Sequence, residues 1–411
     1  MFKVVMISPL PPESAGESAY TAALIDRLAS NENVRIYAIA GPDAYDLPTI
    51  SSRVTTMKIW NGRSIRYPFT LLNAIVKIRP HIVHVQFGPH GAVYGGFYGE
   101  PMIVLLILLR MIGIKTTVTL HSTWMTDQVE QRVSTYGRTS RLSIFARPLF
   151  RLFMKLLKLG TTRIQLSTVK MNSLLKQKFI DEYHFSDSEV DEMPHPCAPV
   201  RNRLDSDEAL HNLRLDGRSV ILVLGYIRRG KGFEVALEAL NKVKQRIPNV
   251  LLLIAGKVQD PDSGAHLVQL KKMSKELNLD EFVRFDSHFI PDDKVPIYFS
   301  AAKILLVPYT ESVGASGPIH NYAGYGTPII AANVGYHMGE TLSGTLTLFK
   351  NRDPVDLAEK LISLLHDNKL RKELGDKQCK YVSNESWDVA AKRTMQNYKE
   401  LLSKIETLTD I

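Results

Sequence analysis

The sequence predicts an α/β protein with two doubly wound domains, each built on a parallel sheet. Strand and helix patterns alternate along the chain in two rounds, which is typical of this architecture. The 411 residues are enough for about two to three domains, and the 45% of apolar residues can fill more than one core. A polar, proline-bearing stretch at 193–207 lies between the rounds. We therefore predict an N-terminal domain over 1–200 and a C-terminal domain over 201–386.

Apolar runs and their periodicity place the individual elements. In the first round, strands are predicted at 3–7, 34–38, 82–86 and 116–121, with a helix at about 20–30. In the second round, strands are predicted at 220–224, 250–255, 283–285, 304–308 and 328–332, with helices at 233–245, 266–277 and 295–300. A long amphipathic pattern over 387–404 predicts a C-terminal helix.

Composition favours a cytosolic protein without a membrane anchor. The two cysteines, Cys197 and Cys379, match no disulfide, redox or metal-ligand spacing. The chain begins directly on a predicted strand, so no signal peptide is expected. The longest apolar run, at 103–109, is much shorter than the roughly 20 residues that span a bilayer, and we interpret it as a buried helix.

Two glycine turns follow predicted strands of the second round. After the strand at 304–308, the small residues Gly314, Ser316 and Gly317 form a turn that opens a helix, whose free N–H groups and dipole favour an anion. After the strand at 220–224, a similar turn is followed by cations at the start of a helix. Two such anion sites in one half of the chain suggest one shared ligand, and we interpret it as a diphosphate.

These motifs resemble those of the retaining glycosyltransferases of family 4. The matching motifs are Gly-Tyr-Ile-Arg-x-x-Lys-Gly at 225–232, Ala-Gly at 255–256, Pro-Tyr at 308–309, Gly-x-Ser-Gly at 314–317 and Gly-Thr-Pro at 326–328. Further marks stand at 16–17, 121 and 386–387, so the resemblance covers most of the chain. It implies the GT-B fold, in which two doubly wound Rossmann-like domains face a cleft and the C-terminal segment, here 387–411, returns to the N-terminal domain.

The resemblance also implies the chemistry. The N-terminal domain is expected to bind the acceptor and the C-terminal domain a nucleotide-sugar, with a UDP- or GDP-sugar as the donor. Transfer is expected to retain the configuration of the sugar, without a metal ion or another cofactor. The departing phosphate then helps to deprotonate the acceptor hydroxyl, so no carboxylate nucleophile is required.

Arg228 and Lys231 are the predicted phosphate ligands. They follow a strand directly, where they can neutralise the diphosphate and stabilise it as it leaves. Many family members carry an arginine where this chain has Tyr226, and we expect Arg228 to take its task. The alternative interpretation is a solvated cluster of cations that caps a helix, and Arg229 is expected to lie on the surface.

The chain departs from the family at the residues that contact the donor sugar and the ribose. The family pattern has two glutamates before the Gly-Thr-Pro turn, but this chain has Asn321 at the second position and Val313 eight residues earlier. Asn321 can still hydrogen-bond a ribose hydroxyl, because an amide both donates and accepts. Glu311 is two residues displaced; it is either the group that reaches the sugar or an exposed loop acid.

Three segments of the predicted N-terminal domain supply further candidates. Gly16 lies in the loop after the first strand, which the resemblance places against the donor phosphates. His121 ends a strand and matches a family histidine that faces the donor sugar. His84 and Gln86 end the neighbouring strand and are candidates for the acceptor pocket, with a core histidine as the alternative for His84. The loop lacks further glycines at nucleotide-fold spacing, which disfavours a dinucleotide oxidoreductase.

We interpret two pairs of aspartates elsewhere in the sequence as helix caps and not as metal ligands. Asp205 and Asp207 precede an apolar helical pattern, and Asp292 and Asp293 precede the helix at 295–300. No metal site is therefore predicted.

A basic segment suggests an anionic partner. Residues 131–180 hold eleven lysines and arginines and no acid, within a chain of net charge +9. Pro148 suits a first helical turn, after which Leu149, Leu152, Phe153 and Leu156 are predicted on one face and Arg151, Lys155 and Lys158 on another. Such a helix favours an anionic membrane surface or a phosphorylated lipid. The alternative is a core-facing helix with a solvated basic face, and nucleic-acid binding is not expected because no recognition module is present.

The predicted function is therefore transfer of one hexose from a nucleotide-sugar to a hydroxyl of a lipid-linked or growing glycan acceptor. The predicted location is cytoplasmic, at the periphery of the cytoplasmic membrane face. A sugar epimerase or phosphorylase of the same fold is one alternative, although we identify neither the extra carboxylates nor the cofactor lysine that these use. A catalytically silent binding or scaffold subunit is the other, because the glutamate pair is missing.

Overall fold

The computed structural model describes residues 1–13, 15–47, 52–62, 64–89, 91–126, 129, 146–258, 261–311, 316–335 and 338–409. The chain divides into two compact units. The first unit comprises Met1–Pro194 and Trp387–Ile411, and the second comprises His195–Ser386.

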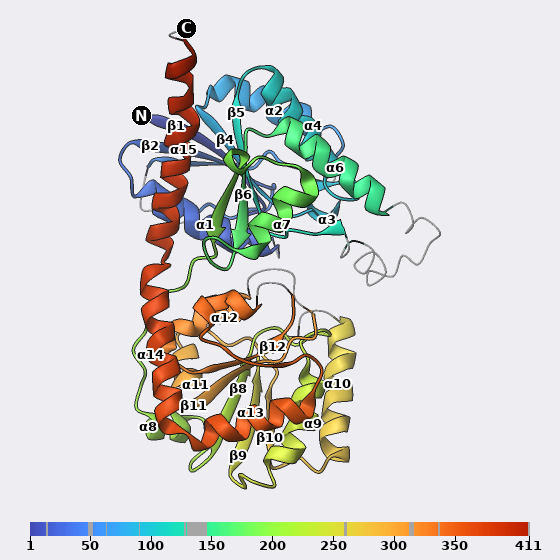
Figure 1. Cartoon of the computed structure of the whole chain (residues 1–411), viewed down its shortest axis with the longest axis vertical. Helices are drawn as coiled ribbons and strands as arrows, with labels where there is room; N and C mark the ends of the chain where they lie inside the picture. Colours follow the sequence, from blue (N-terminus) through green and yellow to red (C-terminus); the bar gives the residue numbers. More distant parts are fainter. Residues whose placement is uncertain are drawn as a thin grey trace. The chain divides into compact units, whose positions relative to one another are not determined.

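The first unit is built on a parallel sheet with the strand order β3-β2-β1-β4-β5-β6-β7 (Figure 1). Its strands are β1 (Phe2–Ile7), β2 (Val34–Ile39), β3 (Val54–Met57), β4 (Ile82–Phe87), β5 (Lys115–Leu120), β6 (Arg163–Thr168) and β7 (Val190–Pro194). Every residue of β4 is buried, as expected for a central strand that is covered on both faces.

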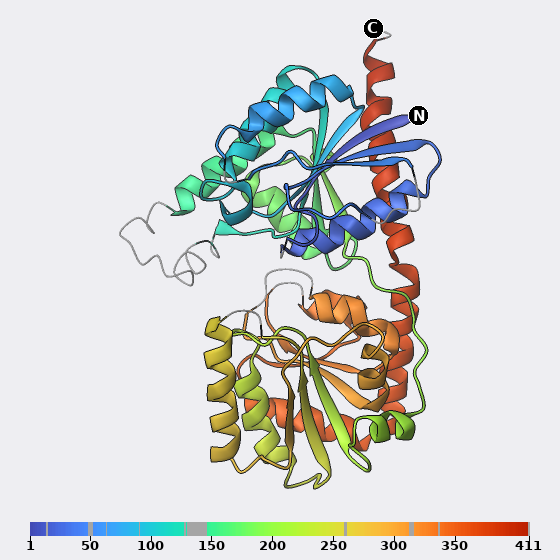
Figure 2. The same ribbon diagram turned by 180° about the vertical axis from the view of Figure 1, so that it is seen from behind.

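Helices cover both faces of this sheet (Figure 1, Figure 2). They are α1 (Gly16–Ala29), α2 (Tyr67–Ile78), α3 (Gly91–Tyr94), α4 (Glu100–Met111), α6 (Ala146–Gly160), α7 (Leu174–Tyr183), the short 3-10 helix η2 (Asp187–Glu189) and α15 (Trp387–Thr409). One apolar core joins the sheet to α2, α4, α6 and α7, and a second core joins it to α1 and α15. The C-terminal helix is thus an integral layer of the first unit.

The second unit holds a parallel sheet with the order β10-β9-β8-β11-β12-β13. Its strands are β8 (Ser219–Leu224), β9 (Val250–Ala255), β10 (Val283–Asp286), β11 (Ala302–Val307), β12 (Ile329–Asn333) and β13 (Thr347–Lys350). Its helices are α8 (Ser206–Asn212), α9 (Phe233–Val243), α10 (Pro261–Glu276), α11 (Val295–Ala301), α12 (Gly317–Tyr322), η3 (Ala323–Tyr325), η4 (Met338–Gly344), α13 (Pro354–His366) and α14 (Asn368–Asn384). A single apolar core unites them.

The strand order reverses between β1 and β4 in the first sheet and between β8 and β11 in the second. In doubly wound sheets, ligands bind outside the carboxyl ends of the strands at such switch points. The segments that follow these four strands are therefore where a site is expected in each unit.

Several predicted features take a different form in the structure. The predicted linker at 193–207 begins inside β7 and ends inside α8, where Asp205 caps the helix by accepting hydrogen bonds from the backbone N–H groups of Asp207 and Glu208, both at 3.0 Å. The predicted apolar face of α6 is wrong in part. Phe153 is buried in the core, whereas Leu149, Leu152 and Leu156 are exposed.

Candidate functional site

The turn after β8 depends on glycines that let backbone segments come close. Gly232 has a φ of 71°, and a Cβ there would lie 1.8 Å from the carbonyl oxygen of Pro308. A Cβ at Gly256, after β9, would lie 2.0 Å from the carbonyl oxygen of Gly225. Any side chain at these positions would collide with backbone, so glycine is required. The backbone N–H of Thr310 donates to the carbonyl of Gly230 at 3.1 Å, which ties this turn to the segment after β11.

Lys231 lies in this turn, over an aromatic ring. Its Nζ is 3.6 Å from the ring centroid of Tyr309, which follows β11. Burial, and secondly the nearby charge of Arg228, lower the pKa of Lys231 to about 7. Burial raises the pKa of Tyr309 to about 12, so the ring stays neutral. The ammonium is therefore held against the end of β11, and among the described residues no anionic partner offsets the effect of burial on its pKa.

The two arginines of the motif differ in their surroundings. Arg228 is exposed, and its Nη1 donates to the carbonyl of Arg229 at 3.2 Å. Arg229 donates to Gln269 at 3.0 Å and lies 3.7 Å from the Asp262 carboxylate on α10. Arg229 thus has the surface role that the sequence predicts, whereas the charge of Arg228 acts on Lys231 and Tyr309.

Helix α12 begins beside the end of β11. Ser316 is its buried N-cap residue and Gly317 its first residue. A Cβ added to Gly317 would meet no atom within 4 Å, so the protein leaves space at this position. Asn321 lies one turn further along α12 with an exposed side chain. Gly314 lies outside the described residues, and its predicted role stays a prediction.

Glu311 follows β11 with a side chain that is 62% exposed. Its Oε1 lies 3.8 Å from Nη2 of Arg352, which is equally exposed. This exposed environment fits the interpretation of Glu311 as a loop acid. Contact of Glu311 with a donor sugar stays a prediction.

In the first unit, His121 heads a chain of buried polar groups. Its Nε2 lies 2.7 Å from Oε1 of Gln86, and because a carbonyl oxygen only accepts, Nε2 carries the proton. The amide of Gln86 lies 3.0 Å from Nε2 of His84, whose Nδ1 lies 2.6 Å from the hydroxyl of Tyr398 on α15. This chain fixes the ring of His121 and leaves its Nδ1 as the acceptor.

Burial keeps both histidines of this chain neutral. It lowers the pKa of His121 to about 4, with a smaller opposite effect from Glu17, and that of His84 to about 3, assisted by His121. His84 and Gln86 are both fully buried, so the core interpretation of His84 is confirmed. The expectation that these two line an acceptor pocket is wrong, because their polar atoms serve to orient His121.

Gly16 is the first residue of α1, and a Cβ there would meet no atom within 4 Å. It follows β1, one of the two switch-point strands of the first unit. The structure therefore brings Arg228, Lys231, Ser316 and Gly317 to one edge of the second sheet, and Gly16 and His121 to one edge of the first. Among the described residues, no group of three or more His, Cys, Asp or Glu side chains could hold a metal ion.

Sequence reasoning missed the partners that position these groups. Tyr309 was noted only as part of a motif, yet its ring lies directly under Lys231. Gln86 and Tyr398 orient His121 from positions far along the chain. A polar residue inside an otherwise apolar strand, such as Gln86 in β4, is the one local signal that pointed to a buried hydrogen bond.

Donor binding is expected to weaken as the pH rises through about 7. Below this pH Lys231 is protonated and the affinity for a diphosphate is at its plateau, whereas above it binding must take up a proton. The affinity should then fall by up to about tenfold per pH unit. Calorimetric titration of a UDP- or GDP-sugar between about pH 6 and 9 measures this, since the diphosphate diester itself does not titrate there. Lys231→Arg should remove the slope, and a flat wild-type profile would contradict the assignment.

Comparison with known proteins relates the second unit to a family. Residues 206–380 match the family model described as glycosyl transferases group 1. The D-inositol 3-phosphate glycosyltransferase of Corynebacterium efficiens is 30% identical over 207 residues, which are 49% of this chain and 46% of that protein. The enzyme of the same name from Streptomyces bingchenggensis is 28% identical over 196 residues, covering 46% of this chain and 42% of that protein. The chain spans about half the length of the curated relatives it matches.

Comparison with solved structures extends over nearly the whole chain. Sucrose-phosphate synthase from Thermosynechococcus elongatus aligns with a TM-score of 0.72 at 18% identity, covering 98% of this chain and all of that one. Anabaena HepE, solved in complex with UDP and glucose, aligns with a TM-score of 0.70 at 12% identity over 97% of this chain. These likenesses confirm the predicted GT-B fold class, with two parallel-sheet Rossmann-like domains.

Proposed function

We propose that this protein is a retaining, metal-independent hexosyltransferase that moves one sugar from a UDP- or GDP-sugar to an acceptor hydroxyl. The observation that carries the proposal is the pairing of Lys231 and Arg228, after β8, with the open N-terminus of α12, after β11. These groups lie at the switch point of the unit that matches the family model. The UDP in HepE and the glycosyltransferase names of the relatives support the donor class.

In the proposed reaction, one bond to the anomeric carbon breaks and one bond to it forms. The bond from this carbon to the diphosphate oxygen breaks, and a bond to the acceptor oxygen forms on the same face. The hydroxyl proton passes to the departing phosphate. Lys231 and Arg228 stabilise the charge that develops on the leaving group. In the first unit, the neutral ring of His121, with Nδ1 as an acceptor, is our candidate to accept a hydrogen bond from a sugar hydroxyl without supplying a charge.

The alternatives make different predictions for one assay. The purified protein is first screened by thermal shift with UDP, GDP and their sugars, since a ligand at about 100 times its Kd stabilises by roughly 2.7 kcal/mol. The stabilising donor is then incubated with candidate acceptors, with and without EDTA. Formation of glycoside that survives EDTA supports the proposal. Binding without turnover would favour a silent subunit, and loss of turnover on chelation would contradict the metal-free mechanism.

We also propose that helix α6 places the enzyme on an anionic membrane, near a lipid-linked acceptor. Among the described helices, none has both the length and the apolar character needed to cross a bilayer. The helix has three faces. One face packs in the core, a second carries Arg147, Arg151 and Lys155, and a third exposes leucines. The exposed leucines are Leu149 (53%), Leu152 (52%), Leu156 (36%) and Leu159 (64%).

Exposed leucines beside arginines suit the interface of an anionic bilayer, where the acyl region takes the apolar side chains and the headgroups take the charge. Lys158 is less available than the sequence suggests, because it lies 3.5 Å from the Glu189 carboxylate and donates to the carbonyl of His184. The other basic residues of the segment at 131–145 lie outside the described residues.

Vesicle binding is expected to depend on both exposed faces of α6. Arg151→Gln with Lys155→Gln should weaken sedimentation with anionic vesicles, because each cation near the surface contributes about 1 kcal/mol. Leu152→Ser with Leu156→Ser should weaken it at every salt concentration. The matched control is Lys242→Gln with Lys275→Gln on exposed positions of the second unit. If the fraction of protein that sediments with vesicles is the same for anionic and neutral lipid, at low and high salt, and for wild type and both α6 variants, this helix only packs against its own domain.

A further inference from the structure

The first unit contains a cavity of about 530 Å³ at the carboxyl edge of its sheet. Its walls come from the segments after β1, β2 and β3 and from α3, so it lies at the same edge of the sheet as Gly16 and His121. The volume is in the range of small-molecule sites. None of the residues assigned above to donor binding lines it.

A buried aromatic cluster holds one wall of the cavity in place. The indole of Trp60 is only 3% exposed and packs against Tyr67 and Tyr94, with ring centroids 6.1 and 5.3 Å away. Its backbone N–H donates to the carbonyl of Ala40 at 3.0 Å, which ties the segment after β3 to the end of β2. Gly62 completes the fit, because a Cβ there would lie 1.8 Å from the carbonyl oxygen of Val93.

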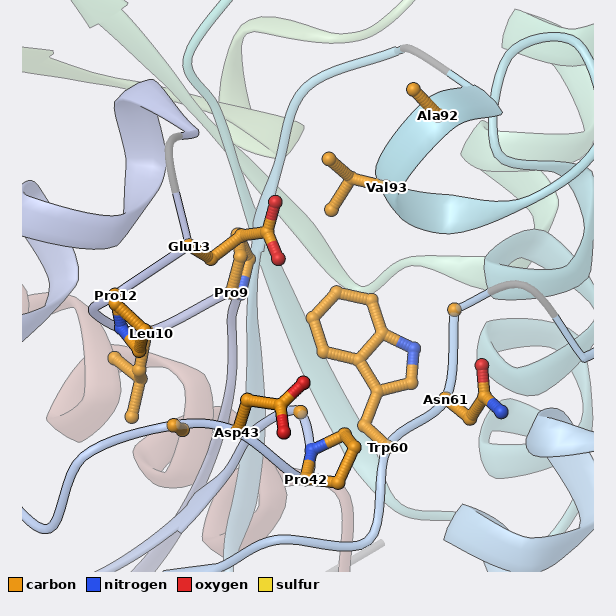
Figure 3. A pocket seen from close by; sticks show the side chains of 13 residues that line it. Pro9, Leu10, Pro12, Glu13, Pro42, Asp43, Trp60, Asn61, Ala92 and Val93 are labelled. Carbon is orange, nitrogen blue, oxygen red and sulfur yellow. The ribbon is translucent and has the colours of Figure 1, made fainter.

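Two carboxylates point into the same space from different loops. Figure 3 shows the side chains of Glu13 and Asp43 converging beside the six-membered ring of Trp60. Glu13 follows β1 and Asp43 follows β2, so the strand order brings them together. Within the described part of the chain, neither carboxylate has a hydrogen-bond or ion-pair partner. The indole Nε1 of Trp60 is buried and likewise has no hydrogen-bond partner there.

The charge of the lining selects among acceptors. The described lining residues include two acids and no lysine, arginine or histidine. Among the described lining residues, a phosphate group would meet two carboxylates that repel it and no cation to pair with. Ionised carboxylates accept hydrogen bonds from several hydroxyls at once. The apolar lining residues Pro12, Pro42 and Val93 are not buried and can pack against the C–H groups of a saturated ring.

The geometry points to a binding site for an uncharged polyhydroxylated ring, such as a terminal hexopyranose, with Glu13 and Asp43 accepting from its hydroxyls and the apolar lining residues Pro12, Pro42 and Val93 against its C–H groups. This inference rests on the proposed function in one respect, since it assigns the ring to the acceptor. It separates this chain from an enzyme whose acceptor is phosphorylated on the ring, the acceptor that the names of the relatives state for those proteins.

The test compares neutral rings with their phosphates on the full-length protein. Saturation-transfer NMR with methyl hexopyranosides and myo-inositol, against hexose 6-phosphates and inositol 3-phosphate, reports binding without turnover. Asp43→Asn and Glu13→Gln keep the shape and remove the charge, and each should weaken binding of the neutral ring by about 10- to 100-fold. The matched control is Asp46→Asn, in the same loop, whose carboxylate pairs with Lys58 at 3.2 Å and lies outside the lining.

Where transfer is measurable, Asp43→Asn should raise the acceptor KM and leave nucleotide affinity and the melting temperature unchanged. Tighter binding of the phosphorylated rings than of the neutral ones, or equal binding by wild type and both carboxamide variants, would overturn the inference. If neutral rings bind in the cavity but no nucleotide-sugar is turned over, the ring site stands and the proposed function fails. If Asp43→Asn and Glu13→Gln transfer sugar with the same kinetics as wild type, the proposed function stands and the ring site does not.

Discussion

Replacing Lys231 by methionine is expected to lower the rate of sugar transfer by about 100-fold or more, the usual loss when one electrostatic donor to a developing charge is removed. Methionine keeps the apolar stem over the ring of Tyr309, so the turn after β8 should stay folded. Arg228→Ala should cause a similar loss, because it removes the second charge at the diphosphate. Steady-state transfer from the identified donor measures both, with melting temperatures as the folding control.

Arg229→Ala is the matched control for these variants. Arg229 belongs to the same motif, but its side chain is engaged by Gln269 and Asp262 on α10. Its loss should therefore leave transfer near the wild-type rate. If Lys231→Met and Arg228→Ala are as active as Arg229→Ala, the phosphate site is assigned wrongly and the solvated-cluster interpretation holds.

Replacing Gly317 by valine is expected to abolish donor binding without unfolding the second unit. A Cβ at this position meets no protein atom within 4 Å, so the branched side chain would fill space that the protein leaves open at the N-terminus of α12. That space is where we place the diphosphate. Gly317→Ala, which adds one methyl group, should cause a smaller loss. Nucleotide affinity is measured by calorimetry, and unchanged affinity in a folded Gly317→Val variant would remove α12 from the site.

The central strands could be predicted because their local pattern is unambiguous. All residues of β8 and β9 are buried, and their sequences are continuous apolar runs between turn residues. The sequence analysis does not predict β6 and the edge strand β7, because their polar side chains find partners far along the chain. Arg163 in β6 pairs with Asp191 in β7 at 3.2 Å and with Glu400 on α15 at 3.1 Å. A local pattern cannot reveal such pairing.

The same distinction applies to the sites. The cations and glycines of the donor site stand directly after strands, so the topology of the sheet was enough to predict them. The ring site was not predictable, because it needs Glu13, Asp43 and Trp60 to converge from three separate loops, one of which follows the unpredicted strand β3. The faces of α6 were predicted only in part, since periodicity separates faces but does not say which apolar face meets the core.

The most direct test of the account is the gain in affinity that the second phosphate brings. Titration calorimetry would compare the nucleoside monophosphate with the diphosphate, using the base that stabilises the wild-type protein. We predict that the diphosphate binds at least about tenfold tighter to wild type and to Arg229→Ala, as expected for one charge-assisted contact. In Lys231→Met this difference should nearly vanish. An equal difference in Lys231→Met, or no binding of either nucleotide to wild type, would contradict a diphosphate site at the ends of β8 and β11.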